Sequence, residues 1–208
     1  MDIVLLSLTG LGNGLLSKLK NLGHRVLVVA TREEIGKYPY FSCNNLVYDC
    51  AEKNQEYVFI PRKGKWVHLL DSYLSKADLV LSGTFHRIVP VEYIKDIKYG
   101  LYNIHLSLLP KHKGPSPVFW ARELGDKEYG FTVHEMTNKV DEGKIIFQKK
   151  LILDNASTLG YSLNKLYSYI VSYLPDIIEA IYNPIEIFPP YESTYEGRPP
   201  TLKVQNEN

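Results

Sequence analysis

Short apolar runs separated by turn residues dominate the first third of the chain and predict buried strands. Residues 2–8 form the first run, and residues 25–30 form the second. Between them, the glycine-rich stretch 9–14 is predicted to be a turn, followed by a helix over 15–22 that stops at Gly23. This order of strand, glycine turn, helix and strand is typical of the opening of a doubly wound α/β sheet.

The same alternation of apolar runs and turns continues through the middle of the chain. Ser116 and Pro117 favour a helix start, because serine can cap a helix and proline suits its first turn. That helix is expected to run to about Leu124. The other predicted elements are a weak strand at 57–60, a helix at about 66–75, and strands at 78–82, 101–105, 129–136 and 144–153.

A long amphipathic helix is predicted over about 158–182, and Pro175 is expected to kink it. Its apolar residues recur every three or four positions and form one stripe: Leu159, Leu163, Leu166, Ile170, Leu174, Ile177 and Ile181.

The segment after this helix changes character. Residues 184–200 contain five prolines and several aromatic residues, which is too apolar for a solvated tail. We expect a short hairpin-like extension packed on the core or on a second subunit. The predicted organisation is therefore a catalytic domain over 1–182 and a Pro- and Tyr-rich extension over 183–208.

Composition narrows the function classes. The 208 residues suffice for one sizeable core, and a formal net charge of +1 gives no indication of nucleic-acid or membrane binding. No apolar run approaches the roughly 20 residues that cross a bilayer, and the N-terminus lacks the basic region of a signal peptide. Cys43 and Cys50 have the wrong spacing for a zinc pair, so we expect free thiols, no metal and a cytoplasmic location.

Asn103, His105 and Asp141 are the candidate catalytic residues. Asn103 and His105 lie two positions apart near the end of the strand 101–105, so their side chains point the same way. Open α/β sheets bind ligands at the carboxyl ends of their strands. Asp141 lies in the turn between the last two predicted strands. An amide, an imidazole and a carboxylate in one cleft suggest proton transfer at a carbonyl group.

Each of these residues also has a structural interpretation. A histidine at a strand end is more often structural than catalytic, an asparagine can satisfy loop backbone groups, and an aspartate before Glu-Gly suits a plain turn. Spacing alone does not show that the three meet.

The motifs around Asn103, His105 and Asp141 favour a catalytic role over a structural one. Asn103-Ile-His105-Leu-Ser-Leu-Leu-Pro110, followed by Gly114, resembles the signature of the folate-dependent formyltransferases. Three further segments resemble that family in the same order, and the resemblance covers about residues 1–182. The three segments are Gly83-Thr-Phe-His-Arg-Ile-Val-Pro90, Gly125-Asp-Lys-Glu-Tyr-Gly-Phe-Thr132 and Val140-Asp-Glu-Gly-Lys-Ile-Ile146.

The resemblance implies a Rossmann-like catalytic domain, with a mostly parallel twisted sheet, that uses 10-formyltetrahydrofolate. It implies that His105 is the general acid and base, that Asn103 is the oxyanion donor and that Asp141 tunes the histidine. The pterin would be held mainly by backbone around the following residues: His86, Arg87, Ile88, Val89, Val140 and Asp141.

The acceptor depends on the branch of the family. The methionyl-tRNA branch carries a further basic C-terminal domain, a hydrolase usually carries an N-terminal regulatory domain, and this sequence shows neither. The glycinamide ribonucleotide branch has a loop Ser-Gly-x-Gly-Ser-Asn, from which the stretch 9–14 departs. Gly114-Pro115-Ser-Pro-Val-Phe-Trp120 is similar to the branch that formylates nucleotide-linked amino sugars.

We therefore favour an N-formyltransferase acting on a dTDP-linked 4-amino-4,6-dideoxyhexose, for surface polysaccharide (O-antigen, lipopolysaccharide) biosynthesis. The expected partners are this sugar nucleotide and a second copy of the chain. The expected substrate contacts are Gly12, Asn13, Gly14, Gly114 and Pro115.

Two alternatives stay open, namely a glycinamide ribonucleotide formyltransferase and a non-catalytic folate- or nucleotide-binding protein. No function is assigned to four other histidines, which are His24, His68, His112 and His134.

Overall fold

The computed structural model describes residues 1–7, 10–31, 55–60, 65–85, 87–91, 96–153 and 158–199. Three residues singled out from the sequence, His86, Cys43 and Cys50, lie outside the described residues. The predicted folate contact of His86 therefore stays a prediction.

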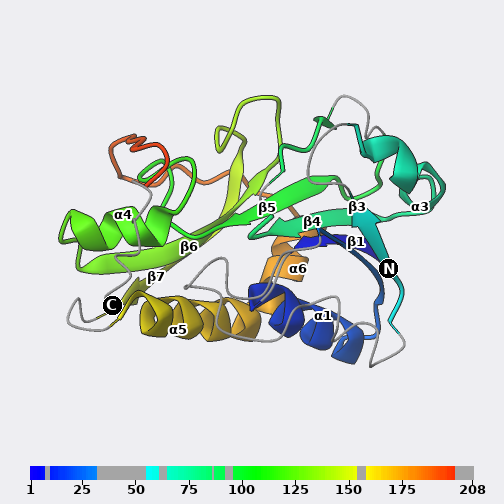
Figure 1. Ribbon diagram of the computed structural model, residues 1–208, viewed down its shortest axis with the longest axis horizontal. Coiled ribbons are helices and arrows are strands. Elements are labelled where there is room, and N and C mark those ends of the chain that lie inside the picture. The colour runs from blue at the N-terminus through cyan, green and yellow to red at the C-terminus, as the bar shows by residue number, and fades with distance from the viewer. Residues whose placement is uncertain are drawn as a thin grey trace, which may run out of the picture.

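A seven-stranded sheet in the order β3-β2-β1-β4-β5-β6-β7 forms the centre of the described chain (Figure 1). The first five strands in this order pair in parallel, whereas β6 is antiparallel to β5 and β7 is antiparallel to β6. The prediction of a mostly parallel α/β sheet is confirmed. The strands are β1 (Asp2–Ser7), β2 (Arg25–Thr31), β3 (Tyr57–Ile60), β4 (Leu79–Gly83), β5 (Leu101–His105), β6 (Glu128–Glu135) and β7 (Ile145–Ile152).

Helices cover both faces of the sheet. The helices α1 (Leu11–Asn21), α5 (Leu159–Ser172) and α6 (Leu174–Tyr182) lie along one face, the lower one in Figure 1, and bury their apolar stripes there. The short helices η1 (Val67–Leu70) and α3 (Asp71–Leu74) pack on the other face against Val4 and Leu6 of β1. The helix α4 (Pro117–Glu123) follows the loop after β5. Among the helices described, none is both long and apolar enough to cross a bilayer.

The strand order places a topological switch beside β1. The chain builds β2 and β3 on one side of β1 and then crosses to β4 on the other. Ligands bind in such sheets outside the carboxyl ends of the strands near the switch. Gly83 ends β4 and pairs with Ile104, one residue before His105, so the segment after β4 starts next to the end of β5.

The start of α1 differs from the prediction. The helix begins at Leu11, so Gly12, Asn13 and Gly14 lie in its first turn and the predicted glycine turn over 9–14 is wrong from residue 11 onward. Gly10 makes the turn instead, with a φ of 61°. The absence of a side chain at Gly14 serves helix packing, because a Cβ there would lie 2.6 Å from Cγ2 of Val171 on α5.

Two other helix predictions need correction. Ser116 precedes α4 but its side chain makes no capping hydrogen bond, because its backbone has the left-handed φ of 59°. The long helix predicted over 158–182 is divided at Tyr173 into α5 and α6, since Pro175 has no N–H and stands in the first turn of α6. Thr158 caps α5 by accepting a hydrogen bond from the Tyr161 N–H.

The described part of the tail, residues 183–199, contains no hairpin. It runs past the edge of the sheet, where the Ile187 N–H donates to the Ile145 carbonyl at 2.8 Å. It then meets the loop after β5 in an isolated parallel bridge between Lys113 and Tyr195. The tail thus packs on the core, which is one of the two predicted alternatives, and the predicted hairpin is not formed within residues 183–199.

Candidate active site

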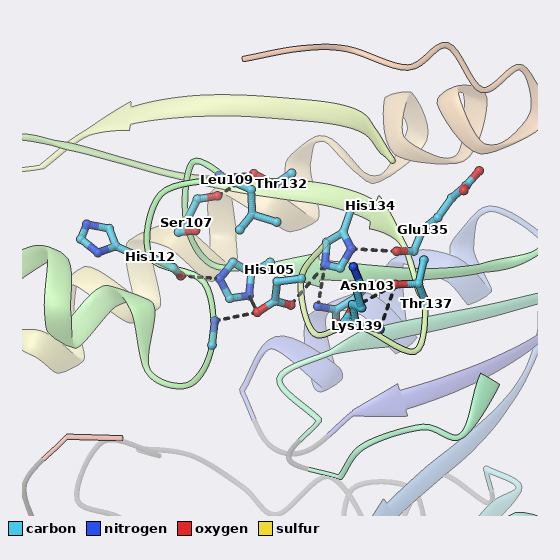
Figure 2. A network of polar contacts seen from close by, with 12 residues as sticks. Asn103, His105, Ser107, Leu109, His112, Thr132, His134, Glu135, Thr137 and Lys139 are labelled. Carbon is cyan, nitrogen blue, oxygen red and sulfur yellow. Dashed lines mark hydrogen bonds and ion pairs between the residues drawn. The ribbon is translucent and has the colours of Figure 1, made fainter. Parts of the chain in front are cut away.

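The three predicted catalytic side chains meet at the end of β5, and a fourth residue, His134, links them. Figure 2 labels Asn103, His105 and His134 of this group. Nδ1 of His105 lies 3.6 Å from Oδ2 of Asp141. Asn103 joins through His134, whose Nε2 lies 3.2 Å from Nδ2 of Asn103 and 3.4 Å from Oδ1 of Asp141. The four side chains therefore form one connected polar network.

Strand register explains this convergence. In the antiparallel pair of β5 and β6, Asn103 lies opposite His134 and His105 lies opposite Thr132. Side chains two apart share a face of a strand, so these four residues lie on one face of the sheet. The alternate residue Ile104 packs on the opposite face among the apolar residues against α1 and α5.

His105 is held as one defined tautomer. Its imidazole is buried, and Nε2 lies 2.8 Å from the His112 carbonyl oxygen, which can only accept. Nε2 therefore carries the proton, and Nδ1 of the neutral ring presents a lone pair toward Asp141. Burial lowers the pKa of His105, and the negative charge of Asp141 offsets only part of this effect.

Asp141 is held ionised by its neighbours. Burial opposes ionisation, but the polar groups around the carboxyl group, including the Gly114 N–H, lower its pKa. The Gly114 N–H donates to Oδ2 at 2.7 Å. The backbone of Asp141 has a left-handed φ of 54°, a conformation that aspartate tolerates better than most residues.

The loop after β5 is fixed by buried hydrogen bonds from β6 and β7. The hydroxyl of Thr132 donates to the Ser107 carbonyl at 2.7 Å and accepts from the Leu109 N–H at 3.0 Å. Gln148 on β7 donates to both Thr132 Oγ1 and the Leu109 carbonyl. These bonds hold the backbone that follows His105, so the imidazole sits on a rigid support.

Sequence reasoning assigned no function to His134 or His112, and the structure places both at the site. Nδ1 of His134 donates to the Glu135 carbonyl at 2.9 Å, which leaves Nε2 to accept from Asn103. The available signal for His134 was alternation, since the polar residues Thr132 and His134 alternate with the apolar residues Phe131 and Val133 in a buried strand. His112 gave no such signal, because its role rests on its backbone carbonyl.

The residues predicted to bind folate differ in exposure. Val89 is buried and packs against the apolar residues beside η1, whereas Ile88 and Val140 are 78% and 55% exposed. Arg87 is partly exposed. A cavity of about 320 Å³ lies at the start of β5 and contains none of these residues; it is lined by Val91, Gly100, Leu101, Tyr102, Glu135 and Met136.

The residues predicted to bind the acceptor fall into two groups. Gly114 is bonded to Asp141, and Pro115 follows it, so both lie at the network. Gly12, Asn13 and Gly14 lie at the start of α1, which follows the carboxyl end of β1. No acidic residue occupies the first turn of α1.

A larger hollow of about 620 Å³ lies between β7 and α5, lined by Leu151, Ile152, Leu153, Tyr161, Lys165, Ser168 and Tyr169. It contains none of the network residues, so we place the candidate site at the end of β5 instead. Within the described ranges, no group of three or more His, Cys, Asp or Glu residues is arranged to hold a metal ion.

Residues 11–177 match the family model described as formyl transferase. The chain belongs to the formyl transferase family. The matched range includes β5, β6 and the loop with Asp141, so the polar network lies inside the part of the chain that matches the family model.

Among curated proteins, the chain is 31% identical to the bifunctional polymyxin resistance protein ArnA of Wigglesworthia glossinidia brevipalpis, over 96% of this chain and 31% of that protein. It is 32% identical to a methionyl-tRNA formyltransferase of Pediococcus pentosaceus, over 65% of this chain and 44% of that protein. The chain thus spans less than half the length of these relatives.

Solved structures share the fold at lower identity. WlaRD, a sugar 3N-formyl transferase crystallised with dTDP and 5-N-formyl-THF, matches with a TM-score of 0.74 and 20% identity, over 95% of this chain and 70% of that one. Phosphoribosylglycinamide formyltransferase from Anaplasma phagocytophilum matches with a TM-score of 0.71 and 19% identity, over 95% and 98% of the two chains. These matches establish the formyltransferase fold.

Proposed function

We propose that this formyl transferase family member moves a formyl group from 10-formyltetrahydrofolate to the amine of a nucleotide-linked amino sugar. The observation that carries the proposal is the buried network in which His105 presents Nδ1 beside an ionised Asp141, with Asn103 joined through His134. This set supplies the base, the orienting carboxylate and the amide donor that acyl transfer to an amine requires.

His105 is the proton carrier in this proposal. Its Nδ1 accepts the proton that the attacking amine loses, because Nε2 is already committed to the His112 carbonyl. The same nitrogen then returns that proton to the departing folate nitrogen. The ionised Asp141 stabilises the imidazolium that exists between the two transfers.

Asn103 stabilises the oxyanion that forms when the amine attacks the formyl carbon. One N–H of its amide faces Nε2 of His134 at 3.2 Å, and this contact orients the group. The amide has a second N–H that can donate to the oxyanion. Such a donor contributes about 100- to 1000-fold in rate.

The folate is proposed to bind beside the loops that follow β4 and β6. Ile88 and Val140 expose apolar side chains on these loops, which suits a flat aromatic ring. Structural neighbours of the same fold were crystallised with 5-N-formyl-THF or folinic acid, which supports a reduced folate as the donor.

For the acceptor we propose a dTDP-linked amino sugar, as part of surface polysaccharide synthesis. Gly114 and Pro115 support this proposal, since they lie beside Asp141 within the stretch that resembles the sugar branch. The neighbour from Helicobacter canadensis was solved with dTDP-3-aminofucose. Methionyl-tRNA is the second candidate acceptor, because several curated relatives are methionyl-tRNA formyltransferases.

A comparison of four acceptors in separate reactions tests the proposed acceptor. The protein is mixed with 10-formyltetrahydrofolate and one acceptor at a time: dTDP-4-amino-4,6-dideoxyglucose, dTDP-3-amino-3,6-dideoxygalactose, glycinamide ribonucleotide or methionyl-tRNA. Mass spectrometry is expected to show one added formyl group on a dTDP-sugar. Formylation of only glycinamide ribonucleotide or methionyl-tRNA would reject the sugar acceptor while keeping formyl transfer.

A further inference from the structure

The loop over residues 110–114 connects the two titrating groups of the network. Its His112 carbonyl accepts from Nε2 of His105, and its Gly114 N–H donates to Asp141. The position of this backbone therefore decides which nitrogen of His105 carries the proton and how Asp141 is oriented.

The backbone of this loop is in an uncommon conformation. His112, Gly114 and Ser116 all have left-handed φ angles, of 55°, 87° and 59°. Such angles cost about 1 to 3 kcal/mol at a residue other than glycine, and they persist where the surroundings hold them. The loop needs contacts on its outer side, away from Asp141, to keep this shape.

Thr194 of the tail supplies those contacts. Its N–H donates to the Pro110 carbonyl at 3.2 Å, and its carbonyl accepts from the Lys113 N–H at 3.0 Å. Its hydroxyl accepts from the His112 N–H at 2.9 Å. One residue thus bonds to the backbone of three loop residues.

Neighbours of Thr194 complete the attachment. Nδ1 of the buried His112 ring lies 3.1 Å from Oε1 of Glu196, and Nε2 lies 2.7 Å from Oδ2 of Asp126. The Gly197 carbonyl accepts from the Trp120 indole N–H at 2.8 Å. Tyr195 covers Gly114 so closely that a Cβ there would lie 2.4 Å from its ring.

We propose that residues 194–197 are a positioning strap for the active site, which holds the 110–114 loop so that His105 keeps its proton on Nε2. Thr194 and Glu196 act through His112 and do not touch the reacting atoms. The strap lies beyond the predicted domain boundary at 182, so the catalytic unit extends to at least residue 197. The proposal rests on the formyl transfer proposed above.

The test compares Thr194→Val with Thr194→Ser in the chain of 208 residues. Valine keeps the branched shape and removes the hydroxyl acceptor, whereas serine keeps it. We expect Thr194→Val to lower kcat about 10-fold with little change in KM for the donor, because the imidazole is misaligned while folate contacts are intact. Thr194→Ser is expected to retain wild-type kcat, and Glu196→Gln to show a smaller decrease.

A second measurement is independent of turnover. In protein labelled with ¹⁵N-histidine, long-range ¹H–¹⁵N spectra report which ring nitrogen of His105 is protonated. We expect an Nε2–H ring in the wild type and in Thr194→Ser, and a mixture of tautomers in Thr194→Val. Wild-type kcat and an unchanged His105 spectrum in Thr194→Val would overturn the proposal, even if the melting temperature falls.

The two proposals fail in distinguishable ways. If the wild type formylates no amine but the His105 tautomer changes in Thr194→Val, formyl transfer is wrong and the strap is supported. If formyl transfer occurs and Thr194→Val changes neither kcat nor the His105 tautomer, the positioning strap is overturned and the proposed reaction stands.

Discussion

The two sides of the 110–114 loop carry similar groups in different arrangements. On the inner side, His105 faces one carboxylate, Asp141, at 3.6 Å, beyond hydrogen-bond distance. On the outer side, His112 lies between two carboxylates, Asp126 and Glu196, at 2.7 and 3.1 Å. The inner ring keeps one nitrogen available for proton exchange, whereas the outer ring is hydrogen-bonded to Asp126 through Nε2 and has Glu196 beside Nδ1. The difference separates a group suited to chemistry from one suited to holding the loop.

Replacing His105 should have the largest effect on the inner side. We expect His105→Ala to lower kcat about 1000-fold, because a positioned acid–base group contributes on that order. Folate affinity, measured by titration calorimetry, is expected to change little. His68→Ala is the matched control, since His68 is exposed and lies outside the network. Wild-type turnover in His105→Ala would remove the catalytic assignment.

Asp141→Asn keeps the shape of the side chain and removes its charge. We expect kcat to fall about 100-fold, because the imidazolium loses the fixed negative charge that stabilises it. Single-turnover measurements separate this loss from donor binding. A rise in KM with unchanged kcat would instead assign Asp141 to substrate binding.

His134→Leu tests the link between Asn103 and Asp141. The variant removes the acceptor for the Asn103 amide and the contact at 3.4 Å to Asp141, so we expect kcat to fall about 10-fold. His134→Gln offers the amide a new acceptor and is expected to recover part of the rate. Equal rates for the leucine and glutamine variants would mean that this contact does not orient Asn103.

Asp126→Asn should act on stability more than on rate. Hydrogen bonds from His112 and Lys111 outweigh burial and lower the pKa of the Asp126 carboxyl group, so its ionised form is stabilised in the folded protein. We expect a loss of about 1 to 2 kcal/mol in the free energy of unfolding at neutral pH, measured by urea denaturation. Lys150→Met, which breaks a half-exposed ion pair with Glu128, is the control and should stay within about 0.5 kcal/mol.

The acid limb of the pH–activity profile should lie at a lower pH than an ordinary histidine would give, and the rate at neutral pH should be unaffected. The folded-state pKa of His105 lies below the ordinary value of 6.5, so its neutral form persists below pH 6.5 and activity should fall only at more acidic pH. In the window between the lowered pKa and 6.5 the unfolded chain binds more protons at this residue. Stability therefore falls as the pH drops through that window. Denaturation curves of His105→Gln are expected to lack this part of the slope, and an identical slope would contradict it.

Strand patterns were the most predictable part of the fold. The strands 57–60 and 101–105 match their predicted bounds, and the others differ by one or two residues. Helix starts were less predictable, because Gly12 and Gly14 look like turn residues until Val171 is seen to pack against the helix. That contact joins residues far apart in the chain, and no local pattern encodes it.

The site was predictable where chemistry depends on side chains. Asn103, His105 and Asp141 are brought together as their types suggested. His134 was missed because its role depends on the pairing register of β6 with β5. His112 and Thr194 were missed because their bonds to the site run through the backbone of the 110–114 loop, and a sequence shows side chains rather than backbone hydrogen bonds.

The close approach of Gly143 to the backbone of Glu135 gives a way to separate active from inactive homologues by sequence. A Cβ at this position would lie 1.8 Å from the Glu135 carbonyl oxygen, the same atom that accepts from the His134 ring. Any side chain at 143 would displace that carbonyl, and with it the imidazole that links Asn103 to Asp141. We therefore expect a homologue that keeps Asn103, His134 and Asp141 but carries another amino acid at position 143 to bind its ligands without turning them over, as a pseudoenzyme.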